Sequence, residues 1–387
     1  MLNQILSKVM VRLSSLKITV VCLFSLFVLV FVGTLAQVSY GIYQTQQRFF
    51  LSAFVWLDTG FGFSIPILPG AELIGSIMII NLSAVIWTKN LLSVKKLGLG
   101  LMHVGMIFLL VGAWITSAAG IESQMAIKEG QTASYSESSR VNELVFEASL
   151  NDTQNKEYVI SQQYLEKNTF VEDTQLPFTI KLLNVWPNAW LRRTSDLDNS
   201  QVKGLGQSIS VAPKPLATQD NELNFFTVKI EILNKEGGSE GIWIVSRGLG
   251  TKQTVIIDDL SYDMSIRSER YHYPFSITLK DFTHDVYPGT QIPKNFSSLV
   301  ELNDSETGET RDVLVYMNHP LRYRGHTFFQ ASYGENNTLS VLQVVKNPGW
   351  RIPYIACLMI SFGLCFHFLV KLAAFSNKQR KREKGLS

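Results

Sequence analysis

The stretch LGLGLMHVGMIFLLVGAWITSAAGI, from Leu97 to Ile121, carries one ionisable side chain, His103. About 20 apolar residues in a helix cover the roughly 30 Å of a bilayer's hydrocarbon core, so this stretch predicts a membrane-spanning helix over residues 97–117. An imidazole inside such a helix is costly in apolar surroundings and is often functional. Two interpretations are open: His103 binds a ligand or takes part in a relay, or it packs with a hydrogen bond to a neighbouring helix.

Three further apolar stretches predict spanning helices, at about residues 18–36, 73–88 and 351–371. Three groups of basic residues flank them: Lys8, Arg12 and Lys17; Lys89, Lys95 and Lys96; and Lys378, Arg380, Lys381, Arg382 and Lys384. Because basic residues favour the cytoplasmic side, we expect a multi-pass protein of the cytoplasmic (inner) membrane with both termini in the cytoplasm. The basic tail, residues 372–387, could alternatively bind nucleic acid, but beside a span it is better explained by retention in the cytoplasm.

Between the third and fourth spans, residues 122–350 are polar, with short alternating runs separated by Gly, Asn and Pro. Such runs predict strands, for example in Glu143–Ala148 and Phe225–Ile232. We expect Asn151–Lys167 to be helical or irregular, Asp196–Asn221 to be a mobile loop, and Gln37–Ala71 to be an outer loop. The predicted fold is a polytopic membrane protein with four transmembrane α-helices and a large, mainly β extracytoplasmic domain between helices 3 and 4. Residues 1–121 form its N-terminal membrane region.

Composition excludes several classes of protein. The chain has 387 residues, of which 46% are hydrophobic, and a formal net charge of +3. This is too apolar for a soluble enzyme and too polar for a pure transporter. Its three cysteines all lie in apolar runs, and none forms a C-x-x-C pair, which argues against a thiol–disulfide exchanger and against a zinc site.

Within the third span, Gly98, Gly105 and Gly112 recur every seven residues and form one smooth stripe. Such a stripe lets another helix approach closely. At about 100° per residue, His103 lies roughly 160° from Gly105, so it faces something other than that helix. Counting from Leu97 at 1.5 Å per residue, His103 lies about 9 Å into the cytoplasmic half of the membrane.

His367 of the fourth span lies four residues before Lys371 and could share this depth. It is either an amphipathic residue that reaches for the interface or a second axial ligand.

The surroundings of His103 favour haem as its ligand. Zinc needs three or four ligands, and proton relays usually contain carboxylates, but no such groups occur within these spans. Iron in a flat apolar macrocycle takes imidazole as an axial ligand. Haem is therefore the hypothesis, with His103 as its axial ligand through the iron.

The blocks Tyr316–Tyr333 (YMNHPLRYRGHTFFQASY) and Pro274–Ser298 (PFSITLKDFTHDVYPGTQIPKNFSS) resemble the ResB-like (CcsB) family of cytochrome c biogenesis proteins. The core of the third span, from His103 to Ala113, and Asn347-Pro348-Gly349 before the fourth span are also similar to it. So is the order of three spans, a large outer domain and one closing span.

This resemblance implies a component of the system II cytochrome c maturation complex. Such a protein pairs with a multispan CcsA/ResC-type protein and helps to carry haem across the membrane for attachment to apocytochrome c. Thioredoxin-like thiol reductase components are further possible partners, whereas nucleic acid is not. The family's haem-ligating histidine corresponds to His103. The chain would be an accessory subunit of a haem lyase or synthase complex, with no catalytic residue of its own.

His319 and His326 lie in the first block and are further candidates for haem contact, with Arg322 and Arg324 available to haem propionates. The other interpretation is a turn, built on Pro320 and Gly325, whose polar residues face solvent.

Two other functions remain open. The chain could be a non-catalytic membrane-anchored scaffold or sensor with a periplasmic β domain, in which His103 only packs. An ion or proton carrier is less consistent with spans that contain no carboxylate.

Overall fold

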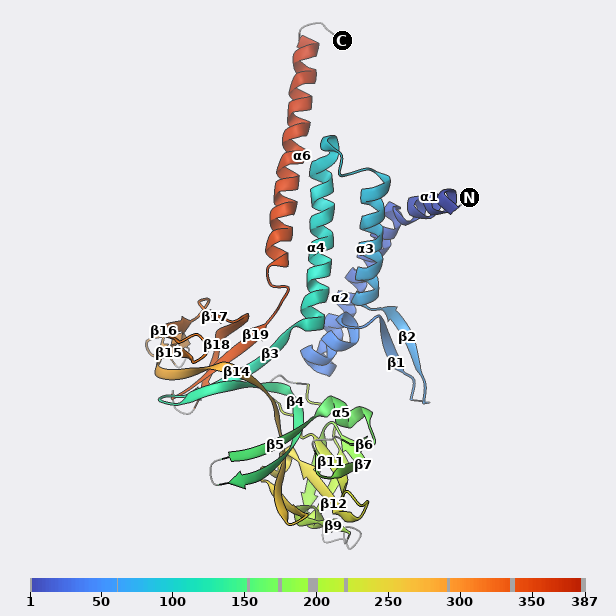
Figure 1. Cartoon of the computed structure of the whole chain (residues 1–387). Coiled ribbons are helices and arrows are strands. Elements are labelled where there is room, and N and C mark those ends of the chain that lie inside the picture. Colours follow the sequence, from blue (N-terminus) through green and yellow to red (C-terminus); the bar gives the residue numbers. More distant parts are fainter. Residues whose placement is uncertain are drawn as a thin grey trace. The chain divides into compact units, whose positions relative to one another are not determined.

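The computed structural model describes residues 2–60, 62–151, 154–172, 176–193, 201–218, 222–290, 293–334 and 338–383. The chain forms two compact units, shown together in Figure 1. Residues 1–121 and 346–387 make up the helical unit, and residues 122–345 make up the β unit.

The helical unit is built on four long apolar helices. They are α2 (Leu16–Thr45), α3 (Ala71–Thr88), α4 (Leu97–Ala119) and α6 (Ile352–Glu383). All four are long and apolar enough to cross a membrane, which indicates a membrane protein. A 3₁₀ turn, η2 (Val94–Lys96), leads into α4. The four expected apolar helices are therefore present, and α2 extends beyond the expected 18–36.

The glycine stripe of α4 packs against α6, as the sequence predicts. A Cβ atom placed on Gly98 would lie 2.7 Å from the carbonyl oxygen of Gly363, and one on Gly105 would lie 3.0 Å from that of Ala356. One on Gly112 would lie 2.8 Å from Cγ2 of Ile352. No real Cβ fits at the shorter of these distances, so glycine is what permits this close approach of the two helix backbones.

An amphipathic helix, α1 (Leu2–Leu13), precedes α2 and was not expected from the sequence. Asn81 of α3 holds the junction between them. Its side-chain amide donates to the carbonyl oxygens of Leu13 (2.6 Å) and Ser15 (3.2 Å), and it accepts from the hydroxyl of Thr19 (2.8 Å). Asn81 is only 2% exposed, so these bonds satisfy a polar group that is otherwise costly to bury.

The expectation of an outer loop over Gln37–Ala71 is wrong. Helix α2 continues to Thr45, a π-helix, η1 (Gln46–Phe50), follows, and β1 (Phe54–Asp58) then pairs with β2 (Ser64–Pro69) in an antiparallel hairpin. The aromatic and β-branched residues of this segment, which suggested an outer loop, have a high propensity for strands. The glycines between β1 and β2 favour a turn that joins the two strands.

The β unit contains most of the strands. They are β3 (Ile121–Lys128), β4 (Thr132–Asn151), β5 (Gln154–Ser161), β6 (Phe170–Val171), β7 (Thr179–Trp186), β8 (Ala189–Arg193), β9 (Val202–Lys203), β10 (Ile209–Pro213), β11 (Thr227–Leu233), β12 (Ser239–Ser246), β13 (Gln253–Ile257), β14 (Leu260–Val286), β15 (Pro293–Asp304), β16 (Glu309–Tyr316), β17 (Leu321–Tyr323), β18 (His326–Gly334) and β19 (Leu339–Lys346). The unit is mainly β, as expected, with a short helix α5 (Gln162–Lys167) and 3₁₀ turns η4 (Gly204–Ser208) and η5 (Arg247–Leu249).

Within the described residues, the largest sheet has ten strands. Its main path runs β16-β15-β14-β4-β3-β19-β18-β17, with β13 beside β14 and β5 beside β4. A five-stranded sheet has the order β6-β7-β11-β12-β9, and β8 pairs with β10.

Strand β14 passes through two separate hydrophobic cores. Its first half contributes Met264 and Ile266 to a core shared with β4, β7 and β11, while its second half contributes Ile277 and Leu279 to a core shared with β3, β15 and β18. The register of β14 against β4 shifts between the two halves, between Ser268 and Arg270 and again after His272. These irregularities let one long strand serve both cores, because bulges bend and twist a strand.

Two local expectations in this unit are corrected. Residues 154–161 form strand β5, and only Gln162–Lys167 is helical, because β5 pairs with β4 along its length. Asp196–Asn221 is not one loop: β9, η4 and β10 lie within it, and β10 pairs with β8. Residues 196–200 and 219–221 of that segment lie outside the described residues.

Candidate functional site

His103 lies on α4 and is half-buried. Its Nδ1 atom is 2.8 Å from the carbonyl oxygen of Leu99, one turn earlier. A carbonyl oxygen can only accept, so Nδ1 carries the proton, and in the neutral ring Nε2 then presents its lone pair. Within the described part of the chain, Nε2 has no hydrogen-bond partner. The bond from Nδ1 to Leu99 is of the kind by which proteins fix the tautomer and orientation of an imidazole that binds a metal through its other nitrogen.

The phase of α4 places this imidazole away from α6. His103 lies roughly 140° around the helix from Gly98 and 160° from Gly105, which both contact α6. Met106, which is 36% exposed, and Leu110 follow His103 along the same side. The imidazole is therefore on an apolar face that α6 does not cover.

His367 is half-buried on α6 and packs against α4. Its backbone nitrogen would lie 2.8 Å from a Cβ placed on Gly98, so it belongs to the seam between the two helices. His103 faces the other side of α4. The structure therefore does not bring these two imidazoles together.

His319 lies in the connection between β16 and β17 and is exposed. Its ring stacks on that of Tyr316, with centroids 4.1 Å apart and an interplanar angle of 13°. The backbones of the two residues also bond to each other, and Asn318 between them has a φ of 64°. This geometry is that of a solvent-facing turn.

His326 begins β18 opposite Tyr323. Its Nδ1 atom is 3.0 Å from the carbonyl oxygen of Arg324, and its ring meets that of Tyr273 edge to face at 5.0 Å. Arg324 and Gly325 have φ values of 42° and 78°, so the link from β17 to β18 is a two-residue turn with both residues in the left-handed region.

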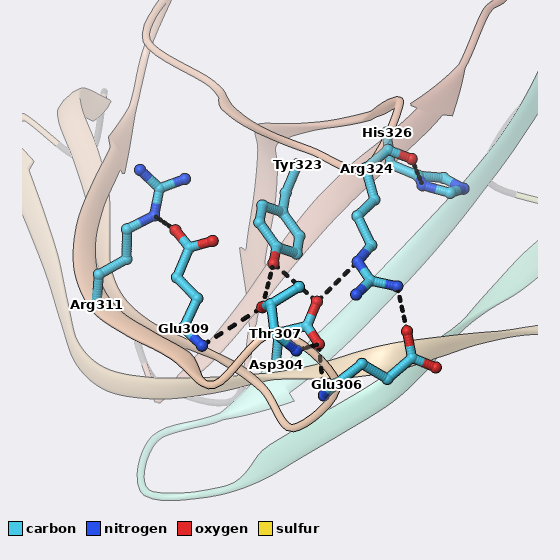
Figure 2. A network of polar contacts seen from close by, with 8 residues as sticks. All are labelled: Asp304, Glu306, Thr307, Glu309, Arg311, Tyr323, Arg324 and His326. Atoms are coloured by element: carbon cyan, nitrogen blue, oxygen red, sulfur yellow. Dashed lines mark hydrogen bonds and ion pairs between the residues drawn. The ribbon is translucent and has the colours of Figure 1, made fainter.

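Asp304 holds this turn against the neighbouring one, between β15 and β16. Figure 2 shows the hydroxyl of Tyr323 and the guanidinium of Arg324 both directed at its carboxylate, each at 2.7 Å. The amides of Glu306 and Thr307 donate to its other oxygen. The Asp304 side chain is fully buried. It is thus a polar hub that joins two tight turns, and sequence reasoning missed it.

The contacts of Asp304 determine its pKa. Burial alone raises the pKa of a carboxyl group, but the hydrogen bonds from Tyr323, Thr307 and Glu306 and the charge of Arg324 outweigh it, so the pKa of Asp304 lies below its ordinary value. Arg324 also pairs with Glu306 at 2.6 Å. Its guanidinium is therefore engaged within the protein, which favours the interpretation of this block as a structural turn.

Arg247 lines a pocket of about 550 Å³ in the β unit, together with Tyr135 and Ser268. Its guanidinium donates to the side chain of Asn142 at 2.9 Å, and burial lowers its pKa. No carboxylate of the described residues pairs with it at ion-pair distance. Nothing in the local sequence pattern distinguished this arginine, because the pocket forms only when β4 and η5 meet.

Two comparisons with known proteins bear on this chain. Residues 230–341, which include both Pro274–Ser298 and Tyr316–Tyr333, match the model of the ResB-like family. The chain is also 25% identical over 307 residues to Protein NrfI of Wolinella succinogenes, a match that covers 79% of this chain and 30% of that protein. The chain thus spans less than a third of the length of this relative. The match over residues 230–341 confirms the resemblance of this chain to the ResB-like family.

Proposed function

We propose that this protein acts in the maturation of c-type cytochromes, as an accessory subunit that handles haem together with a CcsA/ResC-type membrane protein. The similarity to the ResB-like family supports the pathway. Haem is the cargo of this process, and apocytochrome c is the acceptor.

His103 carries the proposal. It is the sole ionisable residue of α4, its Nδ1 hydrogen bond to Leu99 leaves Nε2 as the coordinating atom, and its face of the helix is apolar. These are the properties of an axial ligand to haem iron, which takes neutral imidazole in apolar pockets. The iron and its porphyrin supply the reactivity, and this chain supplies the ligand and the apolar surface beside it.

The proposed topology follows the basic residues. With Lys8 and Arg12 before α2 and Lys95 and Lys96 before α4, both termini lie in the cytoplasm of an inner-membrane protein. The β unit then lies in the periplasm, where it can dock the partner or the apocytochrome. His103 is then in the cytoplasmic half of the membrane, where haem enters.

The test is the haem content of the full chain purified together with its partner, measured by absorption spectroscopy. We expect His103→Ala to lose the haem bands and His367→Ala to keep them, because His367 lies in the α4–α6 seam. Co-purification of the partner with both variants controls for assembly. In His103→Gly, added imidazole should restore the bands. Equal haem content in His103→Ala and in the unaltered protein would contradict the proposal.

A further inference from the structure

Helix α2 breaks near its end. Gly41 has φ 74° and ψ 167°, values outside the helical region, and in Figure 1 the blue α2 ribbon changes direction before the β1–β2 hairpin. A straight helix from Gly33 to Phe50 would be about 25 Å long. Instead, the ring of Phe50 would lie 3.3 Å from a Cβ on Gly33. The chain after Gly41 therefore folds back on the helix before it.

A pocket of about 460 Å³ lies between these two segments. Its apolar wall includes Gly33, Ile42, Phe50 and Leu51, and its polar groups come from Thr34, Gln37, Thr45 and Gln46. No ionisable side chain belongs to this lining, all of which lies within the described residues. A mainly apolar pocket with a few polar groups is the usual form of a small-molecule site, and the absence of charge in its lining selects a neutral ligand.

The hydroxyl oxygen of Thr45 is itself buried and has no hydrogen-bond partner among the described residues, and the residue as a whole is only 3% exposed. The break explains why. A helical threonine usually donates to the carbonyl four residues earlier, as Thr34 does to Val30 at 2.8 Å. For Thr45 that carbonyl belongs to Gly41, which has left the helix. A buried hydroxyl without a partner is unfavourable, so a rotation of the Thr45 side chain that turns the hydroxyl into the pocket, toward an acceptor brought by a ligand, would satisfy it.

The depth of the pocket indicates where the ligand comes from. From Leu16 to Thr34 helix α2 rises about 27 Å, close to the thickness of the hydrocarbon core. With Leu16 at the start of the hydrocarbon core, as in the topology proposed above, the pocket would lie at the boundary between hydrocarbon and headgroups at the far end of this span. A non-helical backbone at such depth is tolerated where it lines a cavity.

We propose that this pocket binds the carbonyl end of a neutral, lipid-soluble molecule, with the hydroxyl of Thr45 as the donor. Two sources of this carbonyl are a quinone, whose flat apolar ring suits the Ile42 and Phe50 walls, and the ester group of a membrane lipid. This site is separate from His103 and does not depend on the proposed handling of haem.

The test uses the full chain in nanodiscs of ether-linked lipids, which lack ester carbonyls, titrated calorimetrically with decylubiquinone against empty nanodiscs. We expect saturable binding that Thr45→Val weakens at least tenfold, because valine keeps the shape but removes the hydroxyl. Thr88→Val on α3 is the matched control: its hydroxyl donates to the carbonyl oxygen of Ala84 at 2.8 Å and lies outside the pocket, so the affinity should stay within twofold. Thr45→Ser should restore binding.

A second arm distinguishes the sources of the carbonyl. The same variants in ether-lipid nanodiscs that also contain diacylglycerol, a neutral ester lipid, are analysed by native mass spectrometry for retained diacylglycerol. Lipid retained by the unaltered protein and by Thr88→Val, but lost from Thr45→Val, supports the site with a lipid as its source. Binding in neither arm, or equal binding by Thr45→Val in both, would overturn the proposal.

Discussion

Gly98 and Gly363 face each other so closely that a Cβ atom on either would lie 2.7 Å from the carbonyl oxygen of the other. The contact is backbone to backbone, so no side-chain rotation can relieve an added methyl group. The seam between α4 and α6 therefore has a fixed separation at this level, and it also fixes which face of α4 is left for His103.

We expect Gly98→Ala to destabilise the helical unit by about 1–3 kcal/mol, the usual cost of overpacking. Thermal unfolding of the full chain in detergent, followed by hydrogen exchange of α4 and α6, measures the effect. Gly75→Ala on α3 is the control, because nothing lies within 4 Å of a Cβ at that position. It should be neutral or slightly stabilising, since alanine is the better helix former. Equal stability of the two variants would show that the seam is not tightly packed.

Asn81 gives a second prediction. Asn81→Leu removes its bonds to Thr19, Leu13 and Ser15, and within the described part of the chain only the carbonyl oxygen of Ser15 keeps a further bond, from the backbone nitrogen of Ile18. We expect faster hydrogen exchange at the α1–α2 junction and a loss of about 1–3 kcal/mol in stability. Ser76→Ala on the same helix is the control, because its hydroxyl bonds only the carbonyl of Glu72 in its own helix. It should leave the junction unchanged.

The sequence predicted the helical unit well where the signal is local. Four apolar runs, the seven-residue spacing of Gly98, Gly105 and Gly112, and the phase of His103 all follow from helical periodicity. The roles of Asn81 and Thr45 were not predicted. That of Asn81 depends on carbonyl groups of another segment, and that of Thr45 depends on the backbone break at Gly41. The pattern of apolar residues shows neither the carbonyl contacts nor the break.

In the β unit, short alternating runs predicted strands but not their length. Strand β14 continues for 27 residues because register shifts let it bend between two cores. The positions of these shifts are determined by the pairing of β14 with β4 and β15. The Asp304–Arg324 pair likewise joins two turns that are 20 residues apart in the sequence. The sequence could therefore identify His326 and Arg324 as candidates from their residue types, but it could not predict their positions or their contacts.

Arg267 yields a third prediction. Its Nη1 and Nη2 atoms bind both oxygens of Glu157, at 3.1 and 2.6 Å, and its Nε binds Glu143 at 2.8 Å. The hydrogen bond from Arg267, opposed by burial, lowers the pKa of Glu157. Arg267→Lys keeps the charge but cannot reproduce this fork, so we expect a loss of about 1–3 kcal/mol in the stability of the β unit.

Urea unfolding of the full chain, followed by hydrogen exchange of β4, β5 and β14, measures the effect of Arg267→Lys. Arg311→Lys is the matched control, because the Arg311–Glu309 pair is largely exposed and such pairs contribute little. Similar destabilisation by both variants would show that the fork has no special role.

Asp304 gives a prediction about pH. Its folded-state pKa lies below the unfolded value of about 3.9, so its contribution to stability is fully present above that value and is lost as the pH falls through the lower folded pKa. We expect the turns at residues 304–309 and 323–326 to stay protected from pH 7 to 5 and to open below about pH 4. Hydrogen exchange of these peptides, corrected for the intrinsic rate at each pH, measures this.

In Asp304→Asn, the two turns should exchange faster already at pH 7, because a neutral side-chain amide accepts the hydrogen bond from Arg324 less strongly than a carboxylate does. This variant should also lack the acid step. Asp312→Asn is the control: Asp312 and its ion-pair partner Lys280 are both exposed, so this variant should behave like the unaltered protein. An acid step that persists unchanged in Asp304→Asn would assign the transition to another carboxylate.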